Sequence, residues 1–300
     1  MNPLQELSKK KLIHPPKWLV DNTMYLTITG SVAYAISNDT SDMDIYGWVI
    51  PPKEDVFPHL KGEIAGFGKQ IQKFEQFQQH GTEDKDARGG DGRVYDFTIY
   101  SIVKYFQLCM ENNPNMVDTL YTPYECILHS TNISKLVRDN RDMFLHKGAF
   151  HKFLGYAHSQ LHKMDNKNPI GKRAESIEKY GFDVKYACHL VRLAYECEMI
   201  LEEGTLDLRR HNEHLKQIRR GEVPQADIKR WFGEKEIQLT KLYQDSKLRN
   251  YPDQEKIKAL LLSCLEEHYG NLENCIVTQT KSEQAILEIN QILEKYKLCR

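Results

Sequence analysis

Two small groups of residues near the start of the chain have the types and spacing for chemistry on phosphates. Gly30 and Ser31 come directly after residues 24–29, a run of β-branched and large side chains that predicts a strand ending at a glycine turn. Glycine lets the backbone approach an anionic ligand closely, and serine adds a hydroxyl donor. Asp42 and Asp44 follow about ten residues later, where a second strand is predicted to begin.

The two acids have the spacing of a metal site. Side chains two residues apart in a strand point to one face, so the carboxylates of Asp42 and Asp44 are predicted to lie side by side. Such oxygens suit a hard cation such as Mg²⁺, which also binds substrate phosphates. Asp96 stands among apolar neighbours in a further predicted strand, residues 94–100, where an acid is disfavoured unless it has a ligand. Asp91 is the alternative third acid.

An Asp-x-Asp pair by itself is more often a solvated turn, so the metal site depends on the glycine turn upstream and on the third acid. Three carboxylates can hold two Mg²⁺ ions, or Mn²⁺ in their place, about 3.5–4 Å apart. Such a pair clamps the attacking and leaving oxygens of an in-line displacement at phosphorus.

Basic side chains gather on two predicted helices. Lys185, His189 and Arg192 have the spacing i, i+4 and i+7, which places them within about 60° on one helix face. That stripe either holds a triphosphate or is a solvated face. A second basic segment offers an RNA phosphate contact, although an exposed helix balanced by acids is the favoured interpretation. Its basic residues are Arg209, Arg210, Lys216, Arg219 and Arg220.

Composition narrows the class of protein. The 300 residues are 40% hydrophobic and 28% charged, which is too apolar for a disordered chain. Lys plus Arg number 41 and Asp plus Glu 42, so any nucleic-acid contact is expected to be a local patch rather than a basic coat. The seven cysteines form no C-x-x-C pair and are expected to be reduced thiols in the core of a cytoplasmic protein. No apolar run is long enough for a membrane helix, and no pattern defines an oligomeric state.

The order of predicted elements indicates an α+β fold: a small mixed-sheet domain at residues 1–125 and an all-helical, substrate-binding domain at residues 126–300. Strands are predicted at residues 24–29, 44–50, 69–77 and 94–100, a short helix at 32–36, and a glycine-rich connection at 80–93. Helices are predicted from Ser101 and at residues 132–140, 149–164, 183–203, 207–220, 225–248, 253–268 and 281–298.

The combination of a hydrophobic strand, Gly30-Ser31, a spacer and Asp42-Met43-Asp44 resembles the signature of the DNA polymerase β nucleotidyltransferase superfamily. More closely, the chain resembles a bacterial and phage group of predicted nucleotidyltransferases. The motifs that carry this likeness are Thr29-Gly30-Ser31-Val32-Ala33-Tyr34, Ser41-Asp42-Met43-Asp44, Asn113-Pro114-Asn115 with Leu120-Tyr121, and Lys185-Tyr186-Ala187-Cys188-His189-Leu190-Val191-Arg192-Leu193.

The resemblance implies a mixed sheet with flanking helices and a helical second domain that completes a cleft. It implies that Asp42 and Asp44 bind both metals, and that Asp96 binds the catalytic ion and helps to deprotonate the acceptor. The sequence departs from the family pattern in residues 80–93, which keeps Asp91 open as the third ligand.

The resulting hypothesis is a metal-dependent nucleotidyltransferase that moves NMP from an NTP such as ATP to an acceptor hydroxyl and releases pyrophosphate. Gly30 and Ser31 are expected to hold the β and γ phosphates, with Lys185, His189 and Arg192 facing them. The acceptor is open among an RNA end such as that of a tRNA, a protein and a small molecule. The alternative is a catalytically silent protein that binds nucleotides or RNA.

Overall fold

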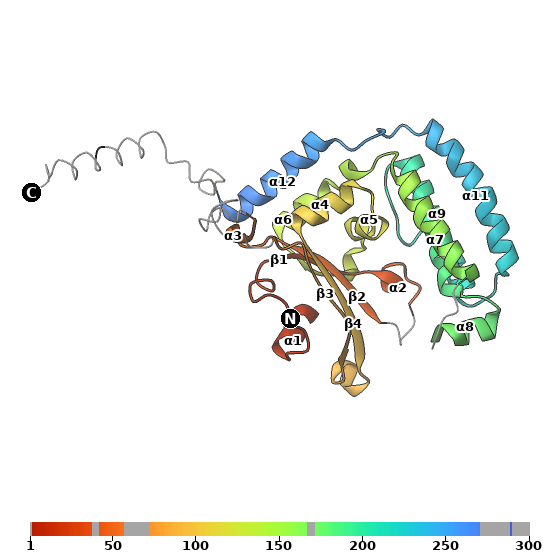
Figure 1. The fold of residues 1–300 in the computed structure, drawn as a ribbon, viewed down its shortest axis with the longest axis horizontal. Coiled ribbons are helices and arrows are strands. Elements are labelled where there is room, and N and C mark those ends of the chain that lie inside the picture. The colour runs from red at the N-terminus through yellow and green to blue at the C-terminus, as the bar shows by residue number, and fades with distance from the viewer. Residues whose placement is uncertain (1, 38–41, 57–72, 167–171, 271–288, 290–300) are drawn as a thin grey trace, which may run out of the picture.

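A computed structural model describes residues 2–37, 42–56, 73–166, 172–270 and 289. A five-stranded mixed sheet is covered and followed by helices (Figure 1). The strands are β1 (Thr23–Ile28), β2 (Met43–Val49), β3 (Gln76–Asp84), β4 (Arg93–Ser101) and β5 (Ile127–Ser130), in the spatial order β3-β4-β2-β1-β5. β2 and β4 run parallel, and the other neighbours are antiparallel. The predicted α+β class is confirmed.

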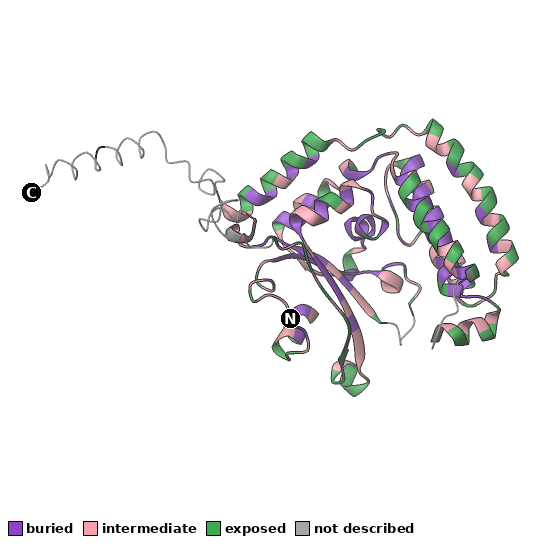
Figure 2. Ribbon diagram, in the orientation of Figure 1, coloured by how far each residue is buried: buried purple, intermediate pink, exposed green. Residues whose placement is uncertain are grey.

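Strand β1 lies inside the sheet and is buried along its whole length (Figure 2). Its side chains enter two hydrophobic clusters, Met24 and Tyr25 the larger one and Leu26 the smaller one. The smaller cluster also contains Leu4 and Leu7 of the N-terminal helix. Both faces of the sheet are therefore covered, which explains why β1 reads as a continuous run of large and β-branched residues.

Twelve α-helices lie in the described part of the chain. They are α1 (Pro3–Lys9), α2 (Gly30–Ala33), α3 (Lys53–Val56), α4 (Ile102–Met110), α5 (Pro114–Tyr121), α6 (Asn132–Asp139), α7 (Ala149–Asn166), α8 (Lys172–Tyr180), α9 (Val184–Glu203), α10 (Asn212–Arg219), α11 (Gln225–Asp245) and α12 (Gln254–Tyr269).

Helix α9 organises the helical part. Asp183 caps it by accepting hydrogen bonds from the backbone N–H groups of Lys185 and Tyr186, and Gly204 ends it in the left-handed conformation. α7, α10 and α11 pack around it. Most α9 side chains are buried, as expected for a helix with neighbours on several sides.

The sheet and the helical part share one core. The larger hydrophobic cluster contains Tyr25 and Trp48 from the sheet together with Leu190 and Leu193 from α9. α12 returns to pack on α4 and α6, as Figure 1 shows. The division of the chain near residue 125 remains a prediction, because the core runs across it.

Two sheet predictions were wrong. The third strand, expected at residues 69–77, begins only at Gln76, and residues 69–72 lie outside the described part. The connection expected at 80–93 is shorter, because β3 continues to Asp84. β3 is a polar edge strand held by backbone hydrogen bonds to β4, so it lacks the apolar signal of a buried strand. The short strand β5 was also missed, although it pairs with β1.

The helix predictions were more accurate. The starts of α6, α7 and α11 agree with the predicted starts at residues 132, 149 and 225. α5 and α8 were not predicted. Pro114 is the first residue of α5, a position that proline favours because its missing N–H is not needed there. The helix predicted at 207–220 is limited to Asn212–Arg219. The helix predicted at 281–298 lies outside the described residues, apart from residue 289.

None of the described helices has the length and apolar character that a membrane span requires. The five cysteines in the described part of the chain are buried and unpaired, in agreement with their predicted place in the core. They are Cys109, Cys126, Cys188, Cys197 and Cys264.

The close approach of β1 and β2 depends on Gly47. A Cβ atom there would overlap the carbonyl oxygen of Tyr25 and lie 2.7 Å from Leu26 Cδ2. We expect Gly47→Ala to lower the free energy of unfolding by about 1–3 kcal/mol, because the two strands must separate. Chemical denaturation measures this, with Gly155→Ala as the control.

Gly155 is exposed on α7, and a Cβ there meets no atom within 4 Å. Alanine at that position should raise the free energy of unfolding by up to about 1 kcal/mol through helix propensity. Equal effects of the two substitutions would contradict the strand-packing argument.

Candidate active site

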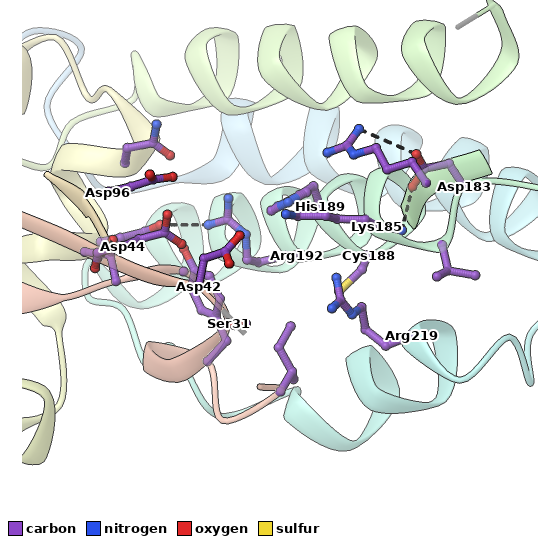
Figure 3. A pocket seen from close by; sticks show the side chains of 18 of the residues that line it. Ser31, Asp42, Asp44, Asp96, Asp183, Lys185, Cys188, His189, Arg192 and Arg219 are labelled. Carbon is purple, nitrogen blue, oxygen red and sulfur yellow. Dashed lines mark hydrogen bonds and ion pairs between the residues drawn. The ribbon is translucent and has the colours of Figure 1, made fainter. Parts of the chain in front are cut away.

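A cleft of about 740 Å³ lies between the sheet and helices α8, α9 and α10. All eight predicted site residues line it: Gly30, Ser31, Asp42, Asp44, Asp96, Lys185, His189 and Arg192. The alternative third acid, Asp91, does not line the cleft and lies at the exposed tip of the β3–β4 hairpin. Figure 3 shows the acids at one end of the cleft and basic side chains from the helices along the rest of it.

The acidic end is built by the register of the sheet. In the parallel pair of β2 and β4, Asp44 lies directly opposite Asp96, so their side chains share one face. Asp42 precedes Asp44 by two residues and is exposed. Burial raises the pKa of Asp44, the Asp96 and Asp42 carboxylates raise it further, and Lys185 lowers it. The three acids therefore act on one another electrostatically, and a cation placed among them would relieve their repulsion.

The Gly30–Ser31 turn is joined directly to this acidic end. The backbone N–H of Thr29 donates to the carbonyl oxygen of Asp44 at 2.8 Å. Gly30 has a φ of 63°, and a Cβ there would overlap the Asp44 carboxylate. α2, which follows, has only four residues, so a helix dipole contributes little and the ligand contacts must come from Ser31 and the local backbone.

The Asp96 carboxylate is engaged by the bend of β3. Its Oδ1 accepts a hydrogen bond from the backbone N–H of Gly81 at 2.6 Å and lies 3.8 Å from His80 Nδ1. As they stand, no three acidic, histidine or cysteine side chains of the described residues converge as a ready-made metal site. The acids still fit Mg²⁺, which keeps several waters and binds through one or two carboxylates together with substrate phosphates.

The opposite wall is basic. Lys185 is exposed at the start of α9, and Arg219 reaches the cleft from the end of α10. Across the described residues, no hydrogen bond or ion pair engages either side chain. Arg173 of α8 lies 3.5 Å from Asp183 and over the ring of Tyr186. Two cations are thus available to an anionic ligand.

His189 is neutral in this environment. Its pKa is lowered well below the usual value, first by burial and then by the positive charges of Arg192, Lys185, Arg219 and Arg173. It can exchange hydrogen bonds with a ligand, but it adds no charge. The positive potential that it experiences comes from three helices, α8, α9 and α10.

Arg192 differs from the other two members of the predicted stripe because its charge is already compensated. Its side chain is 7% exposed, and its Nη1 donates to Asp118 Oδ2 at 2.7 Å and to Glu196 Oε1 at 2.8 Å. The spacing on α9 correctly placed it toward the cleft. Its acidic partners are Asp118 on α5 and Glu196, one turn further along α9. Helical periodicity relates Arg192 to Glu196 but not to Asp118.

Sequence reasoning missed several cleft residues. Arg173 and Asp118 belong to α8 and α5, two helices that were not predicted. Arg219 had been assigned to an exposed basic helix, whereas the packing of α10 against α9 places it in the cleft. Tyr46 carried a usable signal, because it continues the period-two series of Asp42 and Asp44 on β2. Burial raises its pKa to about 12.

The second basic segment is balanced, as the favoured interpretation expected. Lys216 lies 2.6 Å from Glu213, and Arg220 pairs with Glu222. Arg209 and Arg210 pair with Glu125 and Glu203, respectively. Four of its five cations therefore have acidic partners, which disfavours an open phosphate-binding patch.

The mixed sheet positions the glycine turn and the in-register acids across one cleft from a cationic helical wall. A family model described as the RNA repair pathway DNA polymerase beta family, RlaP, matches residues 2–261. The chain belongs to this family, and that membership supports a nucleotidyltransferase role.

Two further proteins are similar to parts of the chain. An uncharacterized 38.9 kDa protein of Enterobacteria phage T4 is 25% identical over 143 residues, which are 47% of this chain and 38% of the phage protein. The match thus spans less than half of that relative. The crystal structure of a nucleotidyltransferase-like protein from Exiguobacterium sibiricum aligns with 94% of this chain and 76% of its own, at 10% identity and a TM-score of 0.29, which marks only loose overlap.

The contact between Gly30 and Asp44 leads to a binding test. We expect Gly30→Ala to abolish the Mg²⁺-dependent thermal stabilisation by ATP, because the new Cβ displaces the Asp44 carboxylate and strains the turn. Differential scanning fluorimetry with and without Mg²⁺–ATP measures this. Gly89→Ala is the control, since Gly89 has a φ of 74° at the hairpin tip and a Cβ there meets no atom within 4 Å. Loss of the ATP effect in both variants would contradict the local explanation.

Proposed function

We propose that this protein transfers a nucleotidyl group from a Mg²⁺-bound NTP to an acceptor hydroxyl and releases pyrophosphate. The observation that carries the proposal is the pairing of Asp44 with Asp96 across β2 and β4, at the end of a cleft whose other wall offers the cations of Lys185 and Arg219. Among the described residues, neither Lys185 nor Arg219 pairs with the acids at the other end of the cleft. A metal–triphosphate has the complementary charge pattern, since its cations meet the acids and its phosphates meet the helices.

Each residue then has a defined task. Asp42 and Asp44 hold the metal ions, and Mn²⁺ can replace Mg²⁺. When bound, the ions neutralise charge on the phosphates and activate the attacking oxygen. Ser31 and the backbone at Gly30 orient the β and γ phosphates, and Lys185 offsets the negative charge that develops toward pyrophosphate.

Asp96 has the task of moving a proton. Asp96, whose carboxylate now accepts a hydrogen bond from Gly81, would be a further ligand of a bound ion. Its carboxylate receives the acceptor hydroxyl's proton as that oxygen bonds to the α-phosphorus and the bond to pyrophosphate breaks. His189, which is neutral, orients a phosphate oxygen by donating a hydrogen bond. Catalysis consists mainly of positioning and charge neutralisation.

An RNA end is the acceptor class that we favour. The family description places related proteins in an RNA repair pathway. The chain has a net charge of −1, and most cations of its second basic segment are paired, so the RNA is held locally at its terminus rather than along its length. A tRNA end satisfies this condition. A protein hydroxyl or a small molecule is the other outcome of the acceptor test.

Incubation of the protein with each α-³²P-labelled NTP, Mg²⁺ and total cellular RNA plus soluble protein tests the activity. Label on a discrete RNA band that disappears in Asp42→Asn/Asp44→Asn is the expected result, with a loss of at least about 10³-fold, because the metal ligands are removed. Asp86→Asn/Asp91→Asn, which changes two exposed acids near the hairpin tip, is the matched control and should retain activity.

Label on protein instead of RNA would overturn the acceptor class but not the transfer. A missing label together with pyrophosphate release in a metabolite panel would indicate a small-molecule acceptor. ATP stabilisation that persists in Asp42→Asn/Asp44→Asn, with no pyrophosphate release on any acceptor, would favour the silent nucleotide-binding protein.

Two adjacent arginines at the end of α10 differ in their position, since Arg219 lines the cleft and Arg220, the C-cap residue, does not. We expect Arg219→Ala to raise the KM for NTP about tenfold, because the protein loses a cleft cation that has no acidic partner among the described residues. Arg220→Ala removes a neighbouring cation that pairs with Glu222 outside the cleft and should leave the KM unchanged. Steady-state kinetics of pyrophosphate release measures both. A larger effect of Arg220→Ala, accompanied by weaker RNA binding, would instead support an RNA-binding surface on this helix.

A further inference from the structure

A buried group of charges borders the cleft, and two of its three members help to line it. It consists of Asp118 on α5 and of Arg192 and Glu196 on α9, with relative exposures of 2%, 6% and 2%. A single atom, Arg192 Nη1, donates to Asp118 Oδ2 at 2.7 Å and to the two Glu196 oxygens at 2.8 and 2.9 Å. The group therefore ties α5 to α9 below the site where the nucleotide is proposed to bind.

Tyr34 connects the same group to the phosphate-binding turn. Its hydroxyl donates to Asp118 Oδ2, and its ring faces the Arg192 guanidinium at 4.5 Å. Tyr34 directly follows α2, and its backbone N–H donates to the carbonyl oxygen of Gly30 at 3.3 Å. The backbone N–H of Ile36 donates to the carbonyl oxygen of Ser31 at 2.9 Å. Tyr34 is thus the anchor that joins the Gly30–Ser31 turn to α5 and α9.

Burying these charges costs free energy of folding, so stability by itself does not explain the group. Two buried carboxylates share one guanidinium, and burial raises the pKa of Glu196 to about 8 and also raises the pKa of Asp118. Asp118 Oδ1 and Arg192 Nε are buried without a hydrogen-bond partner among the described residues. Hydrophobic residues of similar volume usually stabilise a core at least as well as such a group does. A role in geometry accounts for the group better than a role in stability.

We propose that Tyr34, Asp118, Arg192 and Glu196 are positioning residues that fix the Gly30–Ser31 turn at a set distance from α9. The turn and Lys185 then contact the same triphosphate from opposite walls without rearrangement. Arg192 acts through this network, because its side chain is 7% exposed and its Nη1 bonds both carboxylates. The effect on nucleotide affinity rests on the function proposed above, whereas the effect on the turn does not.

Hydrogen exchange measured by mass spectrometry tests the effect on the turn. Tyr34→Phe keeps the ring over Arg192 and removes only the hydroxyl. We expect the amides of residues 30–36 to exchange at least about fivefold faster, with other regions unchanged, because the turn loses its anchor. The matched control is Tyr25→Phe. Tyr25 is also buried, and its hydroxyl accepts a hydrogen bond from Arg138 at 2.6 Å and donates to the carbonyl oxygen of Thr119 at 3.1 Å. None of these three residues lines the cleft.

Arg192→Lys is the second variant, since it retains the charge but loses the planar fork of donors. It should give the same faster exchange at residues 30–36. Unchanged exchange there in both Tyr34→Phe and Arg192→Lys would overturn the proposal. Equal acceleration in Tyr25→Phe would overturn it as well, because general loosening of the fold would then be the cause.

Kinetics of pyrophosphate release gives the second readout. Tyr34→Phe should raise the KM for NTP about tenfold and leave kcat within about twofold, because misplacement of the turn weakens binding of the nucleotide. Faster exchange with an unchanged KM would overturn the role in nucleotide binding. If the wild-type protein neither binds NTP nor releases pyrophosphate, the proposed function fails, and the exchange experiment still decides whether the network positions the turn.

Discussion

Repulsion between Asp44 and Asp96 is the constraint on which the rest of the site depends. The parallel register of β2 and β4 places the two carboxylates opposite each other on one face of the sheet, and the pKa of Asp44 is raised by burial and by this neighbour. A sheet gains nothing from two facing acids, since like charges opposite each other destabilise it. The arrangement is useful only when positive charge lies between the carboxylates. When no cation lies between the carboxylates, the cationic helical wall across the cleft and the hydrogen bond from Gly81 to Asp96 both lower the free-energy cost of their repulsion.

Charge in this protein is divided between two kinds of basic residue. Arg192, Arg209, Arg210 and Arg220 each pair with carboxylates of the chain itself, and they connect elements or balance a surface. Lys185 and Arg219 face the cleft without such partners in the described part of the chain. Although the net charge of the chain is near zero, the charges in the cleft are separated into an acidic end and a basic wall. A ligand that carries both cations and phosphates fits this field, and a long nucleic acid fits the surrounding surface poorly.

The helical part of the chain supports the Gly30–Ser31 turn that follows the first strand of the sheet. The Gly30–Ser31 turn is followed by a helix of only four residues, which is too short to hold a phosphate by its dipole. The turn takes its support from Tyr34, which reaches the charges of α5 and α9. The larger hydrophobic cluster, which runs from β1 to α9, keeps these elements together. Family membership agrees with this architecture, because the matched residues, 2–261, include both the sheet and the helices that complete the cleft.

The sequence by itself determined the local features. The strand before Gly30, the Asp-x-Asp spacing and the stripe of Lys185, His189 and Arg192 each depend on a period within one element, and each placed its residues in the cleft. Tertiary structure decided the pairings between elements. The register of β2 and β4 sets Asp96, rather than Asp91, beside Asp44, and the packing of α10 on α9 brings Arg219 to the site. Arg192 is neutralised by Asp118 of α5 and by Glu196 on the same buried face of α9. The bounds of polar edge strand β3 were misplaced and the short strand β5 was missed for a related reason, because backbone pairing to a neighbour stabilises both strands and leaves little pattern in their own side chains.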